Sequence, residues 1–256
     1  MNIFQAVVLG IVEGLTEFLP VSSTGHLMLA GRCLGLAQTE FVKSFEIAIQ
    51  TGAISAVLLI YGKTLLKNWQ IWKRILAAFF PTAVIGSLLY KFIKARLLDN
   101  TSVVLWALFI GGVILILFEL IHREKEGASE ELLAITYPKA FAIGLFQALA
   151  VIPGVSRSAA TIVGGLTLGL KRKTIVEFSF LLAVPTLGAA MALDMLKSAS
   201  TFKQGDLWTL ALGFIVSAVV SFLAIRLLLA FVKKHTFIVF GIYRIVVAFL
   251  FWLGMK

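Results

Sequence analysis

The sequence predicts an all-α, polytopic membrane protein, and three observations support that fold class. Hydrophobic residues make up 60% of the chain and charged residues 14%, whereas soluble domains are about 45–50% apolar and about 25% charged. The apolar residues gather in stretches long enough to cross the hydrocarbon core, which takes about 20 helical residues. The second half of the chain also repeats the pattern of the first. Together these features exclude a soluble globular domain.

Six stretches are predicted to cross the membrane as helices. They are residues 45–61, 75–92, 103–121, 176–196, 207–229 and 237–253. Residues 3–19 carry two glutamates and end at Pro20, and residues 26–36 are too short to cross. We expect this pair to form a re-entrant helical hairpin that enters and leaves on the same side. The most polar stretch, residues 122–139, is predicted to be a cytoplasmic connecting loop.

Residues 140–170 repeat the hairpin pattern of residues 6–36. In this alignment Glu13 falls on Gln147, and Pro20 falls on Pro153 with a shift of one residue. Each half, residues 1–121 and residues 140–256, therefore contains one hairpin and three spans. Because three crossings are an odd number, we expect the two halves to be inverted relative to each other, as in inverted-repeat membrane proteins.

The net charge of +10 does not indicate a nucleic-acid-binding protein. The basic residues lie between apolar segments, where they act as topology signals and contact lipid headgroups. Their distribution places the connecting loop in the cytoplasm and both termini outside. Arg244 lies deeper, inside the last span, and is expected to pair with a carboxylate. Cys33 is the single cysteine, which excludes an intramolecular disulfide.

Residues 13–27, EGLTEFLPVSSTGHL, place polar chemistry inside an apolar segment. Glu13 and Glu17 share one helix face about 6 Å apart. A charged side chain at the bilayer centre costs about 2.5–3.5 kcal/mol on insertion scales, so such a pair indicates function. The two carboxylates repel unless a proton or a cation lies between them, which predicts a divalent-cation site. The alternative is a structural pair that neighbouring polar side chains satisfy.

Hydroxyl side chains follow the break at Pro20. Ser22, Ser23 and Thr24 suit the N-cap of a new helix, whose free N–H groups favour an anion. Capping accounts for one of them, and phosphate binding or nucleophilic attack accounts for the others. His26 titrates close to neutral pH and is a candidate base or nucleophile. A lone histidine is more often a core residue.

The second motif, PGVSRSAAT, covers residues 153–161. Arg157 is flanked by Ser156 and Ser158, with Thr161 one turn further on. The planar guanidinium suits bidentate phosphate binding, and hydroxyls on both sides suit an anion nest. The alternative is an arginine that extends to the lipid headgroups.

The two motifs together resemble those of the undecaprenyl-diphosphate phosphatases of the bacitracin-resistance (BacA) type, and the resemblance covers essentially the whole chain. It implies a bacterial inner-membrane enzyme that recycles the lipid carrier of cell-wall synthesis, confers bacitracin resistance and depends on Mg²⁺ or Ca²⁺. The implied catalytic residues are Glu13, Glu17, Ser23, His26 and Arg157. Ser156 and Thr161 are implied as supporting phosphate contacts.

The expected reaction hydrolyses a polyprenyl diphosphate at a site that faces the exterior. The cation would bridge the phosphates, Arg157 would clamp the terminal one, and His26, Ser23 or water would attack. The residues slightly favour His26 as the catalytic group and Ser23 as a phosphate ligand. Expected partners are the lipid substrate and membrane lipids, with a homodimer as a candidate assembly. The rival function is a secondary transporter or flippase, which the combination of Arg157, hydroxyls and His26 disfavours.

Overall fold

The structure is a computed structural model that describes residues 1–37, 39–97, 100–124, 131–198 and 206–254. These residues form helices and connecting loops, without a strand among them, which confirms the all-α class. The α-helices are α1 (Ile3–Thr16), α2 (Ser23–Cys33), α3 (Glu40–Lys67), α4 (Trp69–Arg96), α5 (Thr101–Ile121), α6 (Tyr137–Ala148), α7 (Arg157–Thr167), α8 (Arg172–Ser198), α9 (Asp206–Phe231) and α10 (Ile238–Gly254). Two short 3₁₀ turns, η1 (Leu132–Ala134) and η2 (Leu149–Val151), flank α6.

Five of the six predicted spans are long and apolar enough to cross a membrane. The spanning stretches are Glu40–Lys67, Trp69–Tyr90, Thr101–Ile121, Arg172–Ala192 and Leu207–Phe231. The sixth, α10, has 17 residues, which at 1.5 Å per residue reach about 25 Å. Large apolar side chains such as Leu59 and Trp208 are exposed on these helices, 75% and 84% respectively. The chain is therefore a multi-pass membrane protein, because such surfaces need a lipid environment.

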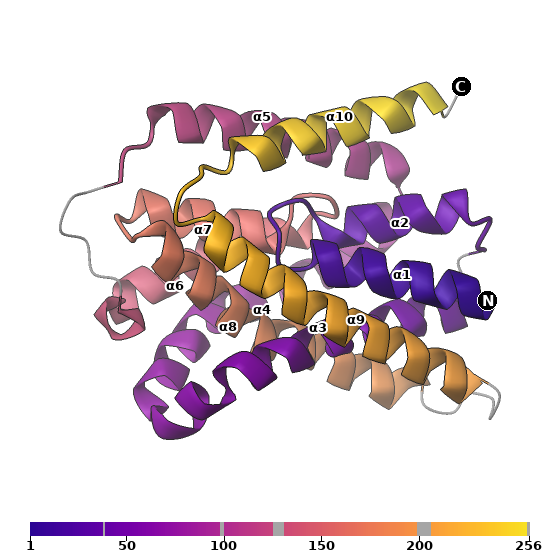
Figure 1. The fold of residues 1–256 in the computed structure, drawn as a ribbon, viewed down its shortest axis with the longest axis horizontal. Coiled ribbons are helices and arrows are strands. Elements are labelled where there is room, and N and C mark those ends of the chain that lie inside the picture. The colour runs from indigo at the N-terminus through magenta and orange to yellow at the C-terminus, as the bar shows by residue number, and fades with distance from the viewer. Residues whose placement is uncertain (38, 98–99, 125–130, 199–205, 255–256) are drawn as a thin grey trace.

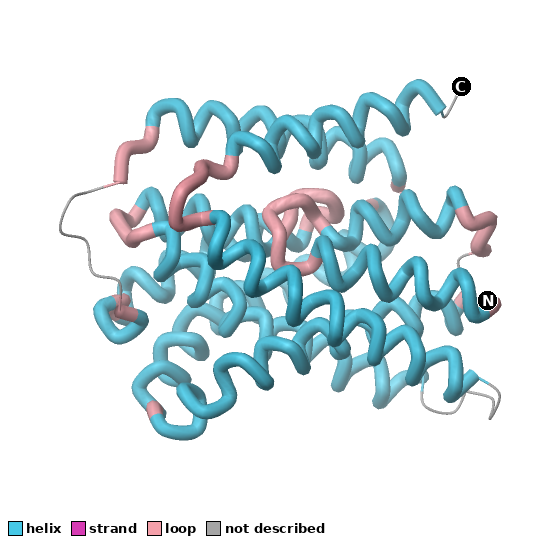
Figure 2. Tube along the Cα trace, viewed as in Figure 1, coloured by secondary structure: helices cyan, strands magenta, loops and turns pink. Residues whose placement is uncertain are grey.

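The two short helix pairs form hairpins, α1 with α2 and α6 with α7. Helix α1 ends at Thr16, three residues before the predicted end, and the chain turns through residues 17–22. In Figure 1, α1 and α2 extend toward the end that holds both chain termini, and α6 and α7 extend toward the opposite end. Figure 2 shows that the loops of both hairpins meet in the centre of the molecule. The predicted order of one hairpin followed by three helices thus occurs twice, while the inversion of the halves stays a prediction.

The predicted halves share one hydrophobic core. Its buried residues include Phe18 and Val57 from the first half and Ile162 and Phe180 from the second. Helix α9 lies against both α1 and α3, and α5 lies along α10 (Figure 1). Packing therefore joins the halves into one body, and the hairpin loops are enclosed by helices from both.

The predicted connecting segment, residues 122–139, is partly structured. Helix α6 begins at Tyr137, and residues 125–130 lie outside the described residues. At the edge of this segment, Arg172 at the start of α8 forms ion pairs with Glu119 (2.6 Å) and Glu124 (3.1 Å). These contacts fix the end of α5 against α8.

Candidate active site

Each hairpin loop ends at a serine with an unusual backbone conformation. Ser22 has φ 74° and Ser156 has φ 76°, in the left-handed region that non-glycine residues rarely adopt. Ser22 caps α2 by accepting a hydrogen bond from the Gly25 N–H (3.4 Å). Ser156 caps α7 in the same way, accepting from the Ala159 N–H (3.1 Å). The prediction that a hydroxyl residue caps the new helix is confirmed, and the capping residue is Ser22.

Arg244 of α10 holds the two loops together. Its guanidinium is fully buried and donates to Pro20 O (3.4 Å) in the first loop and to Gly154 O (2.9 Å) and Val155 O (3.0 Å) in the second. It also donates to two carbonyls of α5, those of Ala107 (2.9 Å) and Leu108 (3.3 Å). The expectation of a carboxylate partner is therefore wrong. Broken helices leave carbonyl oxygens without helical partners, and Arg244 satisfies them.

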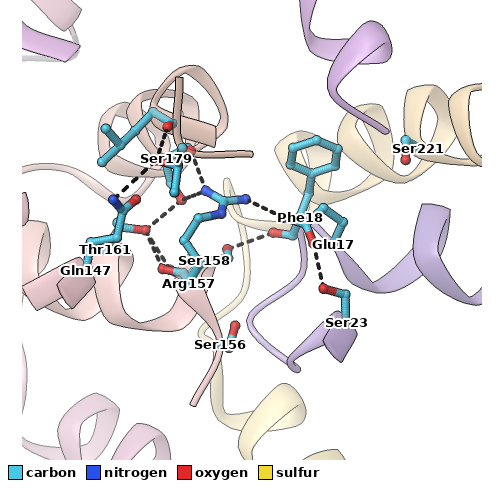
Figure 3. Close-up of polar contacts among 12 residues, drawn as sticks. Glu17, Phe18, Ser23, Gln147, Ser156, Arg157, Ser158, Thr161, Ser179 and Ser221 are labelled. Carbon is cyan, nitrogen blue, oxygen red and sulfur yellow. Dashed lines mark hydrogen bonds and ion pairs between the residues drawn. The ribbon is translucent and has the colours of Figure 1, made fainter. Parts of the chain in front are cut away.

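A hydrogen-bonded series joins the two motifs across 140 residues of sequence. The Ser23 hydroxyl donates to Glu17 Oε2 at 2.5 Å, and Arg157 Nη2 donates to Glu17 Oε1 at 3.0 Å. The side chains of Glu17 and Arg157 are only 5% and 10% exposed. Figure 3 shows Glu17 between the other two. A buried ion pair with every carboxylate oxygen bonded is geometrically fixed, because breaking it would leave an uncompensated charge.

Further hydrogen bonds orient Arg157. Its Nη1 donates to Ser179 O (2.7 Å), and Ser179 Oγ lies 2.6 Å from Thr161 Oγ1 (Figure 3). The Ser158 hydroxyl donates to Phe18 O (2.8 Å) and so ties α7 to the first loop. Ser158 and Thr161 are almost fully buried, at 1% and 0% exposed. Both hydroxyls are bonded to protein atoms, so they position Arg157 and the loop.

A cavity of about 220 Å³ lies where the loops meet. Six predicted site residues line it, namely Glu17, Ser22, Ser23, Thr24, Ser156 and Arg157. Four further polar residues line it, namely Gln50, Thr82, Gln147 and Thr186. Four predicted site residues are not among its lining residues, namely Glu13, His26, Ser158 and Thr161. The structure therefore brings the hydroxyls, one carboxylate and the arginine together.

Both ring nitrogens of His26 are engaged. Nδ1 lies 2.8 Å from Ser22 O, and Nε2 lies 2.9 Å from Tyr243 Oη. The two rings also stack, with centroids 5.4 Å apart. Because a carbonyl oxygen only accepts, Nδ1 carries a proton, and in the neutral ring Nε2 then accepts from the tyrosine hydroxyl. In this arrangement His26 holds the carbonyl of the strained Ser22.

Comparison with known proteins places this site in a family. The profile described as "Bacitracin resistance protein BacA" matches residues 6–250. The chain belongs to the BacA family. It is 50% identical to a protein of Persephonella marina over 99% of both chains, and 49% identical to one of Aquifex aeolicus over 98% of both. A protein of Wolinella succinogenes is 48% identical over the full length of both chains. All three relatives carry the name "Undecaprenyl-diphosphatase".

Glu13, the other predicted cation ligand in this BacA protein, is fully buried. Neither of its carboxylate oxygens has a hydrogen-bond partner among the described residues. The charged groups that interact with it belong to Glu17, Glu46 and Arg157. A buried carboxylate without donors requires a proton or a cation. Glu13 therefore has free oxygens for Mg²⁺ or Ca²⁺, whereas Glu17, whose two oxygens bond to Ser23 and Arg157, could contribute only its remaining lone pairs.

Within the described part of the chain, no three His, Cys, Asp or Glu side chains lie together in a group that could hold a metal ion. The two glutamates would therefore have to share the cation with phosphate oxygens and water, which agrees with a site that binds cation and substrate together.

The motifs alone did not indicate several residues of the site. The internal repeat could have indicated Gln147 as a site residue, since Gln147 aligns with Glu13. Thr82, Thr186 and Ser179 give no sequence signal, because hydroxyl residues are ordinary in membrane helices and commonly bond to their own backbone. Tyr243 could not be assigned either, because its contact with His26 spans 217 residues.

Proposed function

We propose that this chain is a membrane phosphatase that hydrolyses undecaprenyl diphosphate to undecaprenyl phosphate and inorganic phosphate. BacA family membership and the names of its relatives supply the reaction. The observation that carries the proposal is the bonded series Ser23–Glu17–Arg157 at the wall of the cavity. It unites a hydroxyl, a base that accepts its proton and a fixed guanidinium. Those are the groups that phosphoryl transfer requires.

Ser23 is the proposed nucleophile, since its hydroxyl already donates to Glu17. As Ser23 Oγ forms its bond to the terminal phosphorus, its proton passes to Glu17 Oε2. The bond from that phosphorus to the bridging oxygen then breaks, and the bridging oxygen leaves as lipid monophosphate with the proton from Glu17. Water subsequently releases phosphate from Ser23. The atoms balance to one water consumed and one inorganic phosphate formed.

Positive charge for the phosphate comes from Arg157 and from the first turns of α2 and α7. Ser23 and Arg157 are the first residues of these helices, so the free N–H groups of both N-termini lie close to the reacting hydroxyl and the guanidinium. Donors fixed before the reaction stabilise the charge that develops on phosphate oxygens without reorganising.

Glu13 and Glu17 are the residues that would hold the divalent cation. When bound, such a cation neutralises phosphate charge and makes the leaving phosphate less basic. Glu17 would then have two roles, as cation ligand and as the acceptor for the Ser23 proton. Arg157 limits the charge that accumulates around Glu17.

His26 is proposed to position the first loop. The motif alone slightly favoured it as the attacking group, but its two nitrogens bond to Ser22 O and to Tyr243, and it is not among the residues that line the cavity. Ser23 lines the cavity and already has a base. This difference moves the proposed attack from His26 to Ser23.

The proposed location is the bacterial inner membrane, with the site open to the exterior. The excess of basic residues in loops assigned to the cytoplasm supports this orientation. Exposed apolar side chains on the helices provide a surface along which the polyprenyl tail stays in the bilayer, at about 0.8 kcal/mol per buried CH₂. The predicted homodimer stays a prediction.

The test is phosphate release from undecaprenyl diphosphate by the purified full chain in detergent. We expect release by the natural protein and none by Ser23→Ala, with Ser55→Ala as the control because the Ser55 hydroxyl donates to a carbonyl of its own helix (2.6 Å to Gly52 O) and Ser55 does not line the cavity. Rapid acid quench should leave acid-stable phosphoserine. Acid-labile phosphohistidine with an active Ser23→Ala variant would return the role to His26, and a transporter would release no phosphate.

A further inference from the structure

One buried side chain of the cavity has no role in the steps above. Gln147 lies in the apolar helix α6 and is fully buried. Its Nε2 donates to Thr82 Oγ1 (2.9 Å) on α4 and to Thr186 Oγ1 (3.4 Å) on α8. The cavity that these three residues line is the one that contains Glu17, Ser23 and Arg157.

The two threonines fix which way the Gln147 amide points. Thr82 donates its hydroxyl proton to Gly144 O (2.9 Å), and Thr186 donates its proton to Leu182 O (2.7 Å). Each hydroxyl can therefore only accept from Gln147, because a hydroxyl has a single proton. Rotating the amide by 180° would set its oxygen against two acceptors. The orientation with Nε2 toward the threonines follows from the hydrogen-bond network.

This orientation leaves Gln147 Oε1 without a partner. The atom is buried and has no donor among the described residues. A buried acceptor without a hydrogen bond is costly, so such an atom indicates a bound group that supplies a proton. A water molecule matches, because it is small, carries two donors and suits a polar cavity.

We propose that Gln147 holds the water molecule that hydrolyses the phosphorylated Ser23, a role that rests on the proposed function. Gln147 Oε1 accepts a hydrogen bond from one O–H of this water and directs the water oxygen toward phosphorus, and that proton stays on the phosphate that forms. As the oxygen bonds to phosphorus, its second proton passes to Glu17, the bond from phosphorus to Ser23 Oγ breaks, and Glu17 returns a proton to Ser23. Gln147 and Ser23 both line the cavity and lie on either side of Arg157 in Figure 3, so water and the phosphorylated serine would meet beside the guanidinium.

An uncharged amide suits this role better than a carboxylate. Glu13, the counterpart of Gln147 in the first hairpin, would repel the oxygens of a phosphorylated serine if it stood at this position. The carboxamide oxygen accepts a hydrogen bond from water without adding negative charge beside the phosphate. The internal repeat therefore places a cation ligand in one hairpin and a water ligand in the other.

The test uses the full-length Gln147→Leu protein in detergent, with substrate labelled in its terminal phosphate. We expect a burst of about one lipid monophosphate per protein, followed by turnover reduced roughly 100-fold, since misplacing one reactant costs about that much. Acid-stable phosphoserine should accumulate at Ser23. Turnover at the natural rate, or slow turnover without phosphoserine, would overturn the role of Gln147.

A second variant protects the test against misfolding. Thr186→Val removes one acceptor that orients the amide and should slow the same step by a smaller factor, again with a burst. Thr51→Val is the matched control, because Thr51 makes the same bond to a carbonyl four residues earlier (3.0 Å to Ile47 O) and does not line the cavity. It should behave like the natural protein. An equal loss in both threonine variants would contradict the inference. Turnover by Ser23→Ala would instead remove the serine step of the proposed function, and the water step with it.

Discussion

The hairpin α1–α2 and the hairpin α6–α7 share the backbone conformation at their helix caps and carry different chemistry. Ser22 and Ser156 have φ values of 74° and 76°, and each caps the next helix through its hydroxyl. Both second helices end before a glycine with positive φ, Gly35 at 65° and Gly169 at 76°. Such agreement over strained positions means that one backbone design occurs twice.

The side chains at matching positions carry different charges. Ser23 is the first residue of α2 where Arg157 is the first residue of α7, and Glu13 of α1 corresponds to Gln147 of α6. The first hairpin thus supplies carboxylates and the serine proposed as nucleophile, and the second supplies a guanidinium and a neutral amide. The repeated backbone brings the N-termini of α2 and α7 to one cavity. Because the side chains differ between the repeats, the first residues of these helices are a serine, Ser23, and an arginine, Arg157.

The first way to challenge the comparison is an all-or-none test of topology. If the hairpins open to opposite sides, a cysteine at Thr39, the N-cap of α3, should label from outside the cell. A cysteine at Gly127, outside the described residues, should stay unlabelled. Both substitutions are made in a background that lacks Cys33, the single natural cysteine. The reverse labelling would mean that the protein has the opposite membrane orientation, with the first hairpin open to the cytoplasm.

A second test concerns the charge that distinguishes the second hairpin. Arg157→Lys keeps the positive charge but loses the planar guanidinium that bonds to Glu17 and Ser179 through two separate nitrogens, so phosphate release should fall by about 10²–10³-fold. Membrane insertion should be unchanged. Arg226→Lys is the control, because Arg226 lies on the exposed surface of α9 over Phe222. The buried contacts with Glu17 and Ser179 contradict an arginine that extends to the headgroups, so near-natural release by Arg157→Lys would mean that the charge suffices without the planar fork.

The membrane-spanning helices could be predicted from the sequence because such helices follow from hydrophobicity and length alone. The sequence also located both loops, since Pro20 and Pro153 interrupt apolar segments that would otherwise continue. The predicted end of α1, residue 19, is three residues too late. The helix ends at Thr16 because the chain already turns at residues 17–22, ahead of Pro20.

The site was harder to predict where it depends on contacts between distant elements. Arg244 reaches carbonyl oxygens of both loops, and carbonyls that a broken helix exposes cannot be read from residue types. The choice between His26 and Ser23 likewise depends on which side chain Tyr243 and Glu17 contact. Residue types therefore predict which groups are candidates for the reaction. Their hydrogen-bond partners follow only from the way α5 and α10 pack around the loops.

A third test compares Glu13 with its counterpart Gln147. Chelation should abolish phosphate release, and Mg²⁺ or Ca²⁺ should restore it. Glu13→Gln should raise the cation concentration needed for half-maximal release by at least about 10-fold, because it removes a charged ligand. Gln147→Leu should leave that concentration unchanged while slowing turnover. Full activity in excess chelator would mean that phosphate release needs no divalent cation, and the proposed cation site would be wrong.

The smallest expected effect concerns the backbone that the hairpins share. Ser22→Ala and Ser156→Ala each remove a capping hydrogen bond, which costs about 1 kcal/mol of stability. Each keeps the Cβ that strains the left-handed backbone, at roughly 1–2 kcal/mol, and loses the hydrogen bond that offsets that strain.

Glycine at the same positions loses the cap but removes the strain, so Ser22→Gly and Ser156→Gly should be more stable than the alanine variants. Thermal unfolding in detergent measures this order without reference to activity, which both serines also affect because they line the cavity. If the two loops owe their conformation to the same local interactions, the unfolding temperature should fall in the order serine, glycine, alanine at both sites. The differences between the variants should also be similar at the two sites. An alanine variant that matches glycine at one site alone would mean that its turn is held by tertiary contacts such as those of Arg244, and that the resemblance between the hairpins is limited to their final geometry.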